Sequence, residues 1–502
     1  MFKEKKIDIT GGNNSLPMKI IKSLAIFFIG FPFVGTIIGE LGLPYLITKV
    51  GERGVLIGSI YLIYKIWTAK GGGGNVSNKN KTSTSNSNGI VLGKSKGSLI
   101  TKPENEDGHV AIIGGAGTGK STSVSIPTLL SWKGSALVMD IKGDLSQLTS
   151  NYRERELGNK VFIFDPDSPD CACYDPLEQV TGIDSANELA RNIIPTPIKG
   201  DKFWSNNAQA ILASAVLQGK LERNELFSDI CQRILTTKPE TLIEELTSST
   251  NTQVKLLASA CNGMPEKTLG GVFSELRVHL LTFASDEKIR RATRKTSWTP
   301  QDLENEDGTT VYLRINEKMI AQYKGLISCM ISQILRYLSS RGEGKQPSIM
   351  MLLDELPRLG RVDGLIEGLG TLRSRNVHIV PMVQSLSDLD RHYGQDERKI
   401  LLDNCPYRLV LGVGDYDTQK YFSDLSGTQE IWQKSYNHNW IGLRKGNTQS
   451  LVEKKIIKPE RFGQLKGDKK AILFGFKYPM ELDKAFWYET SSYKRLIETY
   501  KL

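Results

Sequence analysis

The chain has 502 residues, which is enough for two or three domains, and its 39% hydrophobic and 24% charged residues are typical of a mostly globular protein. Its net charge of +10 comes almost entirely from the first 100 residues, which hold 13 Lys and Arg against 4 Asp and Glu, whereas the other 402 residues hold 52 against 51. Composition therefore excludes a globular part that is basic throughout, and six cysteines without a C-x-x-C pair exclude a metal site of the usual cysteine spacing.

Residues 1–70 predict a membrane anchor. Residues 23–39 are uncharged and apolar, close to the shortest length that spans a bilayer, and residues 54–68 form a second run that is interrupted by Lys65. A cleaved signal peptide is the alternative for the first run, but no A-x-A cleavage site follows it. Lysines precede the first run and follow the second, so we expect two spans with both ends in the cytosol.

Residues 71–97 predict a flexible linker. Four glycines open this tract, and Gly, Ser, Asn, Thr and Lys dominate its composition. Such a segment has too little apolar surface to offset the entropy that ordering costs. We therefore expect the globular part to begin at residue 98.

Residues 114–121, GGAGTGKS, match the phosphate-binding loop pattern G-x-x-x-x-G-K-[ST]. An apolar run at 109–113 precedes the loop and a helical pattern follows it, so backbone N–H groups and a helix N-terminus would face phosphate oxygens. Lys120 is expected to reach the β- and γ-phosphates of ATP, and the Ser121 hydroxyl to hold Mg²⁺. The predicted nucleotide-binding residues are Gly114, Gly115, Ala116, Gly117, Thr118, Gly119, Lys120, Ser121 and Thr122.

A second apolar run, at 348–353, ends in two acids, Asp354 and Glu355. This is the arrangement of a Walker B element, in which one carboxylate holds the Mg²⁺ shell and the next orients and polarises the attacking water. We expect Asp354 to take the first role and Glu355 the second. Phosphoryl transfer depends mainly on positioned charge, so these groups would supply most of the catalysis.

Three further polar residues are candidates for catalysis. Gln384 follows the strand pattern at 377–382 and is placed to sense the γ-phosphate, although a backbone cap is an alternative role. Arg373 and Arg375 are candidates for an arginine finger that acts across a subunit interface. Solvated or paired arginines are the alternative for both.

Apolar strand patterns alternate with helical patterns along the rest of the chain, which predicts an α/β fold with a largely parallel sheet covered on both faces. The remaining strand patterns lie at 135–140, 161–164, 311–315 and 407–413. Residues 182–300 have only helical spacing, so we expect an all-α insert there. The P-loop ATPase domain would then consist of residues 98–181 and 301–502.

The ordered motifs resemble the type IV coupling proteins of conjugation and type IV secretion. They include GHVAIIG at 108–114, VMDIKGD at 138–144, YDPL at 174–177, FW at 203–204, LDELPRLG at 353–360 and VQS at 383–385. The resemblance implies a RecA-like ATPase, multi-pass in the inner (cytoplasmic) membrane with its ATPase domain in the cytoplasm, that assembles as a homo-hexamer around a channel.

The same resemblance implies the partners. They are single-stranded DNA with its relaxase and accessory proteins, and the components of a type IV secretion channel, with ATP hydrolysis driving conjugative DNA transfer. Two features depart from the family pattern. The external loop between the spans is short, and no acidic tail follows the ATPase domain, so we expect no substrate receptor of that kind.

Two other functions fit the same features. One is a double-stranded DNA pump of the FtsK type, although such pumps usually carry more spans and a C-terminal winged helix. The other is a nucleotide-gated membrane receptor with little turnover. The intact Lys120, Asp354 and Glu355 argue against an inactive ATPase.

Overall fold

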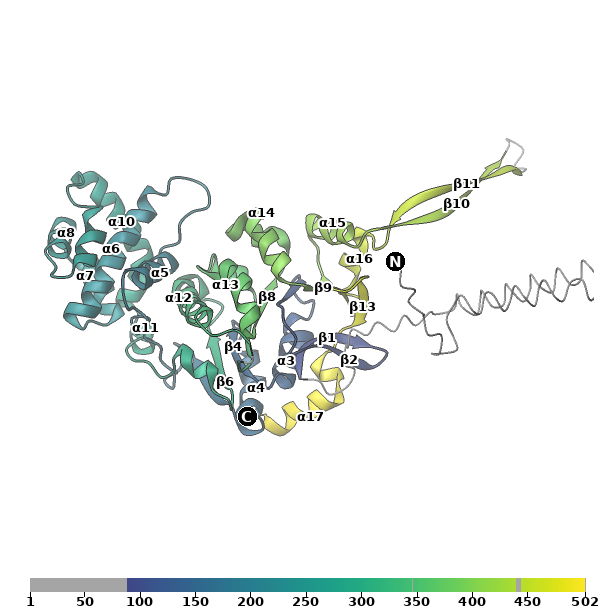
Figure 1. The fold of residues 1–502 in the computed structure, drawn as a ribbon, viewed down its shortest axis with the longest axis horizontal. Helices are drawn as coiled ribbons and strands as arrows, with labels where there is room; N and C mark the ends of the chain where they lie inside the picture. Colours follow the sequence, from purple (N-terminus) through teal and green to yellow (C-terminus); the bar gives the residue numbers. More distant parts are fainter. Residues whose placement is uncertain (1–87, 345, 439–443, 502) are drawn as a thin grey trace, which may run out of the picture. The chain divides into compact units, whose positions relative to one another are not determined.

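One mixed sheet of eleven strands organises the part of the chain that the structure describes (Figure 1). The computed structural model describes residues 88–344, 346–438 and 444–501. The predicted spans at 23–39 and 54–68, and the predicted linker up to residue 87, lie outside these ranges. Across the described ranges, no helix combines the length and hydropathy that crossing a bilayer requires.

Seven neighbouring strands of the sheet run parallel to one another. In sheet order they are β9 (Tyr407–Gly412), β3 (Val110–Gly114), β8 (Val377–Val383), β7 (Ile349–Leu353), β4 (Ser135–Asp140), β6 (Thr309–Arg314) and β5 (Lys160–Phe164). Most are short apolar runs that are buried on both faces, as parallel strands covered by helices must be. The predicted α/β class is confirmed.

Four antiparallel strands extend the sheet beyond β9. In order they are β12 (Lys470–Phe474), β13 (Met480–Asp483), β1 (Gly89–Ser95) and β2 (Ser98–Pro103). The prediction of a flexible linker up to residue 97 is wrong for β1, whose Ile90, Val91 and Leu92 are buried. This run is buried because β1 pairs with both β2 and β13. The three apolar residues do not stand out in the sequence, because the average composition of the tract around them is polar.

Two hydrophobic cores lie on the two faces of the sheet, because alternate residues of a strand point in opposite directions. Ile113 and Leu353 belong to one core, and Ile112 and Leu352 to the other. The first core is covered by α12 (Ile320–Ser339), α13 (Leu365–Thr371) and α14 (Leu386–Asn404). The second is covered by α3 (Ile126–Ser131), α4 (Asp144–Arg155) and α17 (Ser491–Tyr500).

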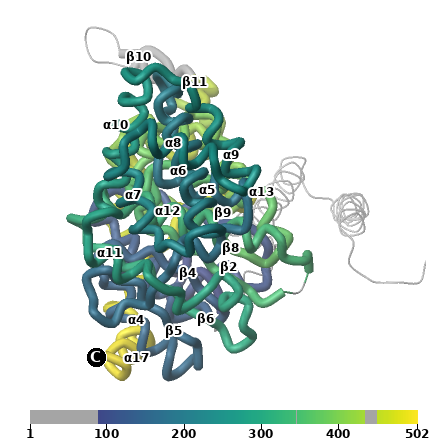
Figure 2. The backbone as a smooth tube through the Cα atoms, turned by 90° about the vertical axis from the view of Figure 1, so that its left-hand side faces the viewer, coloured from purple at the N-terminus to yellow at the C-terminus, as the bar shows by residue number. Residues whose placement is uncertain are grey.

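Between β5 and β6 the described chain forms helices and no strand. These are α5 (Ile183–Ile193), α6 (Phe203–Gln218), α7 (Phe227–Thr236), α8 (Pro239–Thr247), α9 (Thr252–Ser259), α10 (Glu266–Ser285) and α11 (Glu287–Ala292), with turns at Gly219–Arg223 and Pro300–Glu304. Figure 2 views the chain from this side, with α6, α7, α8 and α10 in front of the strands. Their core residues, such as Leu212 and Leu276, continue the core that contains Ile113. Because one hydrophobic core joins these helices to the sheet, it does not divide them into two domains, and the predicted domain boundaries at 182 and 300 stay a prediction.

A long β-hairpin extends from the last part of the sheet domain (Figure 1). Its strands, β10 (Thr428–His438) and β11 (Arg444–Lys455), pair only with each other among the described strands. The hairpin leaves the domain after α15 (Tyr416–Leu425) and returns to it at α16 (Pro459–Gln464). The remaining short elements are η1 (Ser121–Ser125), η4 (Leu356–Leu359), η5 (Leu372–Arg375) and η6 (Trp487–Glu489).

Candidate nucleotide-binding site

The glycine loop lies between β3 and the helical turn η1, at the carboxyl edge of the parallel strands. Gly117 and Gly119 have φ angles of +68° and +95°, which L side chains rarely adopt. A Cβ on Gly119 would also lie 2.9 Å from the Phe486 ring. The Lys120 ammonium is buried in the loop and donates a hydrogen bond of 2.7 Å to the Gly114 carbonyl. The loop therefore has the backbone that phosphate binding needs.

Ser121 and Asp354 meet beside this loop, although 233 positions separate them in the sequence. The Ser121 hydroxyl donates a hydrogen bond of 3.3 Å to Asp354 Oδ2. Burial raises the pKa of Asp354 to about 6, although the Lys120 charge and the Ser121 hydrogen bond oppose this shift. Burial also lowers the pKa of Lys120, and Asp354 and Glu355 oppose that shift.

The Ser121 and Asp354 oxygens fit a magnesium ion. Asp354 Oδ1 is buried and has no hydrogen-bond partner within the described residues. Mg²⁺ prefers oxygen ligands and usually takes only one or two carboxylates, with the other positions left for water and phosphate. The described residues hold no cluster of three or more His, Cys, Asp or Glu side chains suited to a metal.

Glu355 has a strained backbone and a fixed side chain. Its φ and ψ angles of 52° and 45° lie in the left-handed region, which costs a non-glycine residue on the order of 1 kcal/mol. Arg358 Nε lies 2.6 Å from Glu355 Oε2, and Arg358 Nη1 lies 2.7 Å from Glu317 Oε1. Sequence reasoning missed both partners. Arg358 follows Glu355 by only three positions, a spacing that a local turn could have suggested, whereas no local pattern connects either residue to Glu317. The guanidinium of Arg358 thus forms ion pairs with the carboxylates of both Glu355 and Glu317, and it holds the Glu355 side chain in place.

Gln384 lies at the same edge of the sheet. It directly follows β8, which lies between the glycine-loop strand β3 and the Asp354 strand β7. Val383 pairs with Ile113, so Gln384 comes next to the start of the glycine loop. The residue is half-buried. This position is compatible with contact to a terminal phosphate, and its sensor role stays a prediction.

Arg373 and Arg375 lie at the opposite, amino-terminal edge, because the turn η5 precedes β8. Arg375 donates hydrogen bonds to the carbonyls of Arg341 at 2.8 Å and Thr371 at 2.7 Å. Arg373 is exposed, and no hydrogen-bond or ion-pair partner for it occurs in the described part of the chain. Neither arginine therefore lies at the glycine loop of its own chain, and the arginine-finger role stays a prediction for both.

Two lysines from the C-terminal part also hold the glycine loop. Lys484, after β13, is buried and donates hydrogen bonds to the carbonyls of Thr118 at 2.8 Å and Leu465 at 3.3 Å. Burial lowers the pKa of Lys484 to about 8. The exposed Lys466 donates a hydrogen bond of 3.1 Å to the Ala116 carbonyl. No sequence pattern could have revealed the contacts of these lysines with the loop, because they span 350 and 366 positions.

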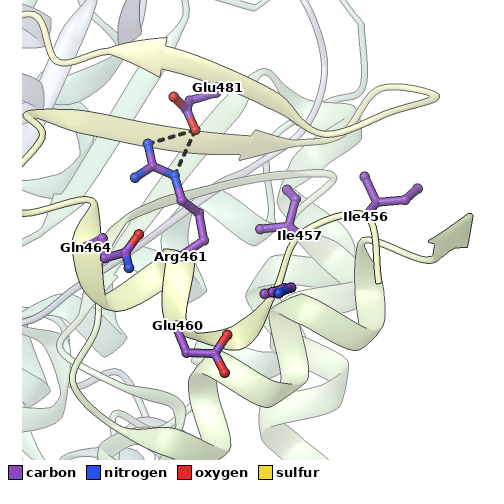
Figure 3. A pocket seen from close by; sticks show the side chains of 7 residues that line it. Ile456, Ile457, Glu460, Arg461, Gln464 and Glu481 are labelled. Carbon is purple, nitrogen blue, oxygen red and sulfur yellow. Dashed lines mark hydrogen bonds and ion pairs between the residues drawn. The ribbon is translucent and has the colours of Figure 1, made fainter. Parts of the chain in front are cut away.

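A separate pocket of about 410 Å³ lies at the foot of the β-hairpin (Figure 3). Its lining comes from the end of the hairpin, from α16 and from β13, and Arg461 crosses it to form an ion pair of 2.9 Å with Glu481. None of the predicted site residues lines this pocket. Because the pocket contains none of the glycine-loop or Walker B residues, we assign it no role in nucleotide binding.

Comparison with known proteins identifies related sequences over most of the chain. A family model described as type IV secretory system conjugative DNA transfer matches residues 73–501. Protein VirD4 of Rhizobium rhizogenes is 25% identical over 434 residues, which cover 82% of this chain and 63% of VirD4. Conjugal transfer protein TraG of Escherichia coli is 25% identical over 401 residues, which cover 72% of this chain and 62% of TraG. The chain thus aligns with less than two thirds of either relative.

Solved structures share the fold. The bacterial conjugative coupling protein TrwBdeltaN70 is similar with a TM-score of 0.58 and 18% identity, over 78% of this chain and 88% of that one. A structure of the plasmid coupling protein TrwB in complex with ADP and Mg²⁺ is similar with a TM-score of 0.55 and 17% identity, over 75% and 85% of the two chains. At these identities the similarity establishes the fold alone.

Proposed function

The chain belongs to the type IV secretory system conjugative DNA transfer family, and on this premise we propose that it hydrolyses ATP to drive single-stranded DNA, bound to a relaxase, into a type IV secretion channel. One observation carries the ATPase part of this proposal. Lys120, Ser121 and Asp354 meet at the carboxyl edge of the sheet, and an unpaired Asp354 oxygen is buried there. The nucleotide and Mg²⁺ bound by TrwB support the same assignment.

The residues would divide the work as follows. The glycine loop and Lys120 bind the phosphates, and Ser121 and Asp354 hold Mg²⁺, which neutralises charge on the phosphates when it is bound. Glu355 orients the attacking water and accepts its proton, with Arg358 holding the carboxylate in place. Gln384 contacts the terminal phosphate from the neighbouring strand end. The chain's own contribution is therefore positioned charge.

The assembly and the location form the second part of the proposal. Two spans at 23–39 and 54–68 would anchor the chain in the cytoplasmic membrane, with the sheet domain in the cytoplasm. A homo-hexamer would bring the free Arg373 of one subunit to the site of the next. Accessory proteins and the secretion channel are the further partners that family membership suggests.

Steady-state ATP hydrolysis by the full chain in detergent micelles, with and without single-stranded DNA, tests the proposal. We expect turnover in the wild type and a loss of about 10²–10⁴-fold in Glu355→Gln, with nucleotide binding retained. Glu343→Gln, which changes an acid at the opposite edge of the sheet, is the control and should keep wild-type turnover. Undiminished hydrolysis in Glu355→Gln would contradict the role of Glu355, and a wild type without turnover would favour a nucleotide-gated receptor.

A further inference from the structure

A cavity of about 780 Å³ lies between the helical insert and the sheet domain. Its walls are the loop after α5, the exposed face of α10, the first turns of α12, and α14. Leu359, Gly360 and Arg361 form another part of the lining. These three residues directly follow Arg358, the ion-pair partner of Glu355, in the chain. The cavity is therefore connected to the predicted catalytic carboxylate by one short segment of chain.

The charges that line this cavity are predominantly positive. Lys199, Lys324 and Arg391 come from three different elements, and none has an ion-pair or hydrogen-bond partner within the residues that the structure describes. The acid of the lining, Asp390, is neutralised by Arg398 at 2.8 Å. Since the globular part of the chain is almost neutral, three unpaired cations around one cavity are a local concentration of charge.

Two histidines on different walls of the cavity lie close enough to Lys324 for its charge to affect their pKa values. His279 lies on α10 and His392 on α14. Burial lowers the pKa of both. Glu275 opposes this shift at His279 and Asp388 opposes it at His392, whereas the charge of Lys324 lowers both pKa values further. Lys324 on α12 is therefore close to both walls of the cavity. The cavity is therefore bordered by lysine and arginine side chains from three elements, with Glu275 and Asp388 as acidic neighbours of the two histidines.

An exposed aromatic pair at the start of α6 packs against α10. The rings of Phe203 and Trp204 pack edge to face at 5.2 Å, and 40% and 38% of these residues are exposed. Trp204 packs against Gly271, where a Cβ would lie 2.5 Å from its ring. Gly271 is two helical turns from Val278, which lines the cavity, so the two residues share one face about 10 Å apart.

We propose that this cavity, together with Phe203 and Trp204, binds single-stranded DNA and transmits its presence to Glu355 through the segment 356–361. Unpaired cations beside exposed aromatic rings are the combination that binds the phosphate backbone and stacks unpaired bases. The inference rests on the proposed function and adds a location for the strand and a route by which the strand changes hydrolysis. A strand that displaces Arg361 would shift Arg358 and hence the carboxylate that orients water.

The double variant Lys324→Gln and Arg391→Gln tests the binding site. In fluorescence anisotropy with a labelled 20-nucleotide strand, each lost phosphate contact should reduce the slope of log affinity against log salt by about 0.7, so about 1.4 in total. The matched control, Lys255→Gln and Lys399→Gln, removes the same charge from exposed positions outside the cavity and should keep the wild-type slope. Equal slopes in both variants, or equal wild-type affinity for a duplex of the same sequence, would overturn the site.

The same proteins test the coupling. We expect the ratio of ATP hydrolysis with and without the strand to fall toward one in the cavity variant and to stay at the wild-type value in the control. A cavity variant that loses strand binding but keeps the stimulation would overturn the route through the segment 356–361. ATP hydrolysis by the wild type without DNA tests the proposed ATPase activity separately. The absence of a DNA-binding site in the cavity and the absence of ATPase activity would therefore give different results. A wild type that hydrolyses ATP but binds no strand would overturn this inference alone.

Discussion

The two edges of the parallel sheet each hold a buried lysine, and the two lysines differ in their surroundings. At the amino-terminal edge, Lys102 Nζ lies 3.0 Å from His378 Nδ1 and donates to the carbonyls of Pro103 and Glu106. At the carboxyl edge, Lys120 donates to Gly114 beside the unpaired oxygen of Asp354. Burial lowers the pKa of both ammonium groups. The comparison teaches that a buried lysine does not by itself indicate a binding site. A buried lysine beside a carboxylate oxygen that lacks a hydrogen-bond partner does indicate one.

The largest expected effect separates these two lysines. Lys120→Ala should reduce ATP hydrolysis by about 10²–10⁴-fold, because it removes the charge that binds the phosphates, and should cost only about 1 kcal/mol in the free energy of unfolding, because the Gly114 carbonyl loses its donor. Lys102→Ala should do the reverse, with a loss of about 2–4 kcal/mol in stability from lost packing and unpaired acceptors. Denaturant unfolding and steady-state kinetics measure the two. Equal losses of stability in both variants would refute the distinction between the edges.

Gly119 offers a sharper test of the carboxyl edge. Gly119→Ala puts a Cβ on a residue with φ of +95° and 2.9 Å from the Phe486 ring, so the loop must move. We expect nucleotide affinity to fall by about tenfold to a hundredfold, since the strain is on the order of 1–3 kcal/mol. Isothermal titration with ADP and Mg²⁺ measures this. Gly364→Ala, at φ of +76° with open space around it, is the control for backbone strain away from the loop.

The pKa of Asp354 predicts a pH dependence confined to this edge. Its value of about 6, raised by burial from the usual 3.8, means that the carboxyl is neutral below pH 6 and binds Mg²⁺ poorly. The affinity for ADP with Mg²⁺ should therefore fall by up to about tenfold per pH unit below 6. Calorimetric titration between pH 5 and 8 checks this. An affinity that does not change over that range would contradict the assignment of Asp354 to Mg²⁺.

The same pKa has a consequence for stability. In the ligand-free chain the folded state binds this proton more tightly than the unfolded state does. The contribution of Asp354 is therefore most favourable below about pH 4 and declines as the pH rises toward 6. Asp354→Asn should lack this component. The difference in unfolding free energy between the wild type and Asp354→Asn, measured across this range, isolates it from the other buried carboxyls.

The smallest expected effect concerns the C-terminal contact with the glycine loop. Lys484→Met leaves the carbonyls of Thr118 and Leu465 without their donor. The nucleotide-binding conformation of the loop should lose about 1 kcal/mol of stability as a result. We expect nucleotide affinity to fall by about fivefold. Lys470→Met removes an exposed lysine that pairs with Asp483, and it should leave affinity unchanged. An unchanged affinity in Lys484→Met would show that the loop does not depend on this contact.

Most of the parallel half of the sheet could be predicted from the sequence. Strands such as 135–140 and 349–353 are continuous apolar runs, because both of their faces are buried. The antiparallel half could not be predicted. The burial of residues 90–92 depends on β13, almost 400 positions away, and a linker-like composition surrounds them. Local composition describes the average of a tract, whereas pairing depends on a few residues within it.

The sequence by itself determined the chemistry of the loop and of the two acids, because a glycine loop and a strand end are local patterns that impose their own backbone. Only the tertiary structure decided which groups surround them. It brought Ser121 to Asp354, placed Lys484 beside the loop and joined Arg358, the local partner of Glu355, to Glu317. These contacts join elements that lie far apart or on different turns, so their geometry depends on how the strands are ordered in the sheet. The sequence pattern shows which side chains are available, and the order of the strands in the sheet determines which of them come into contact.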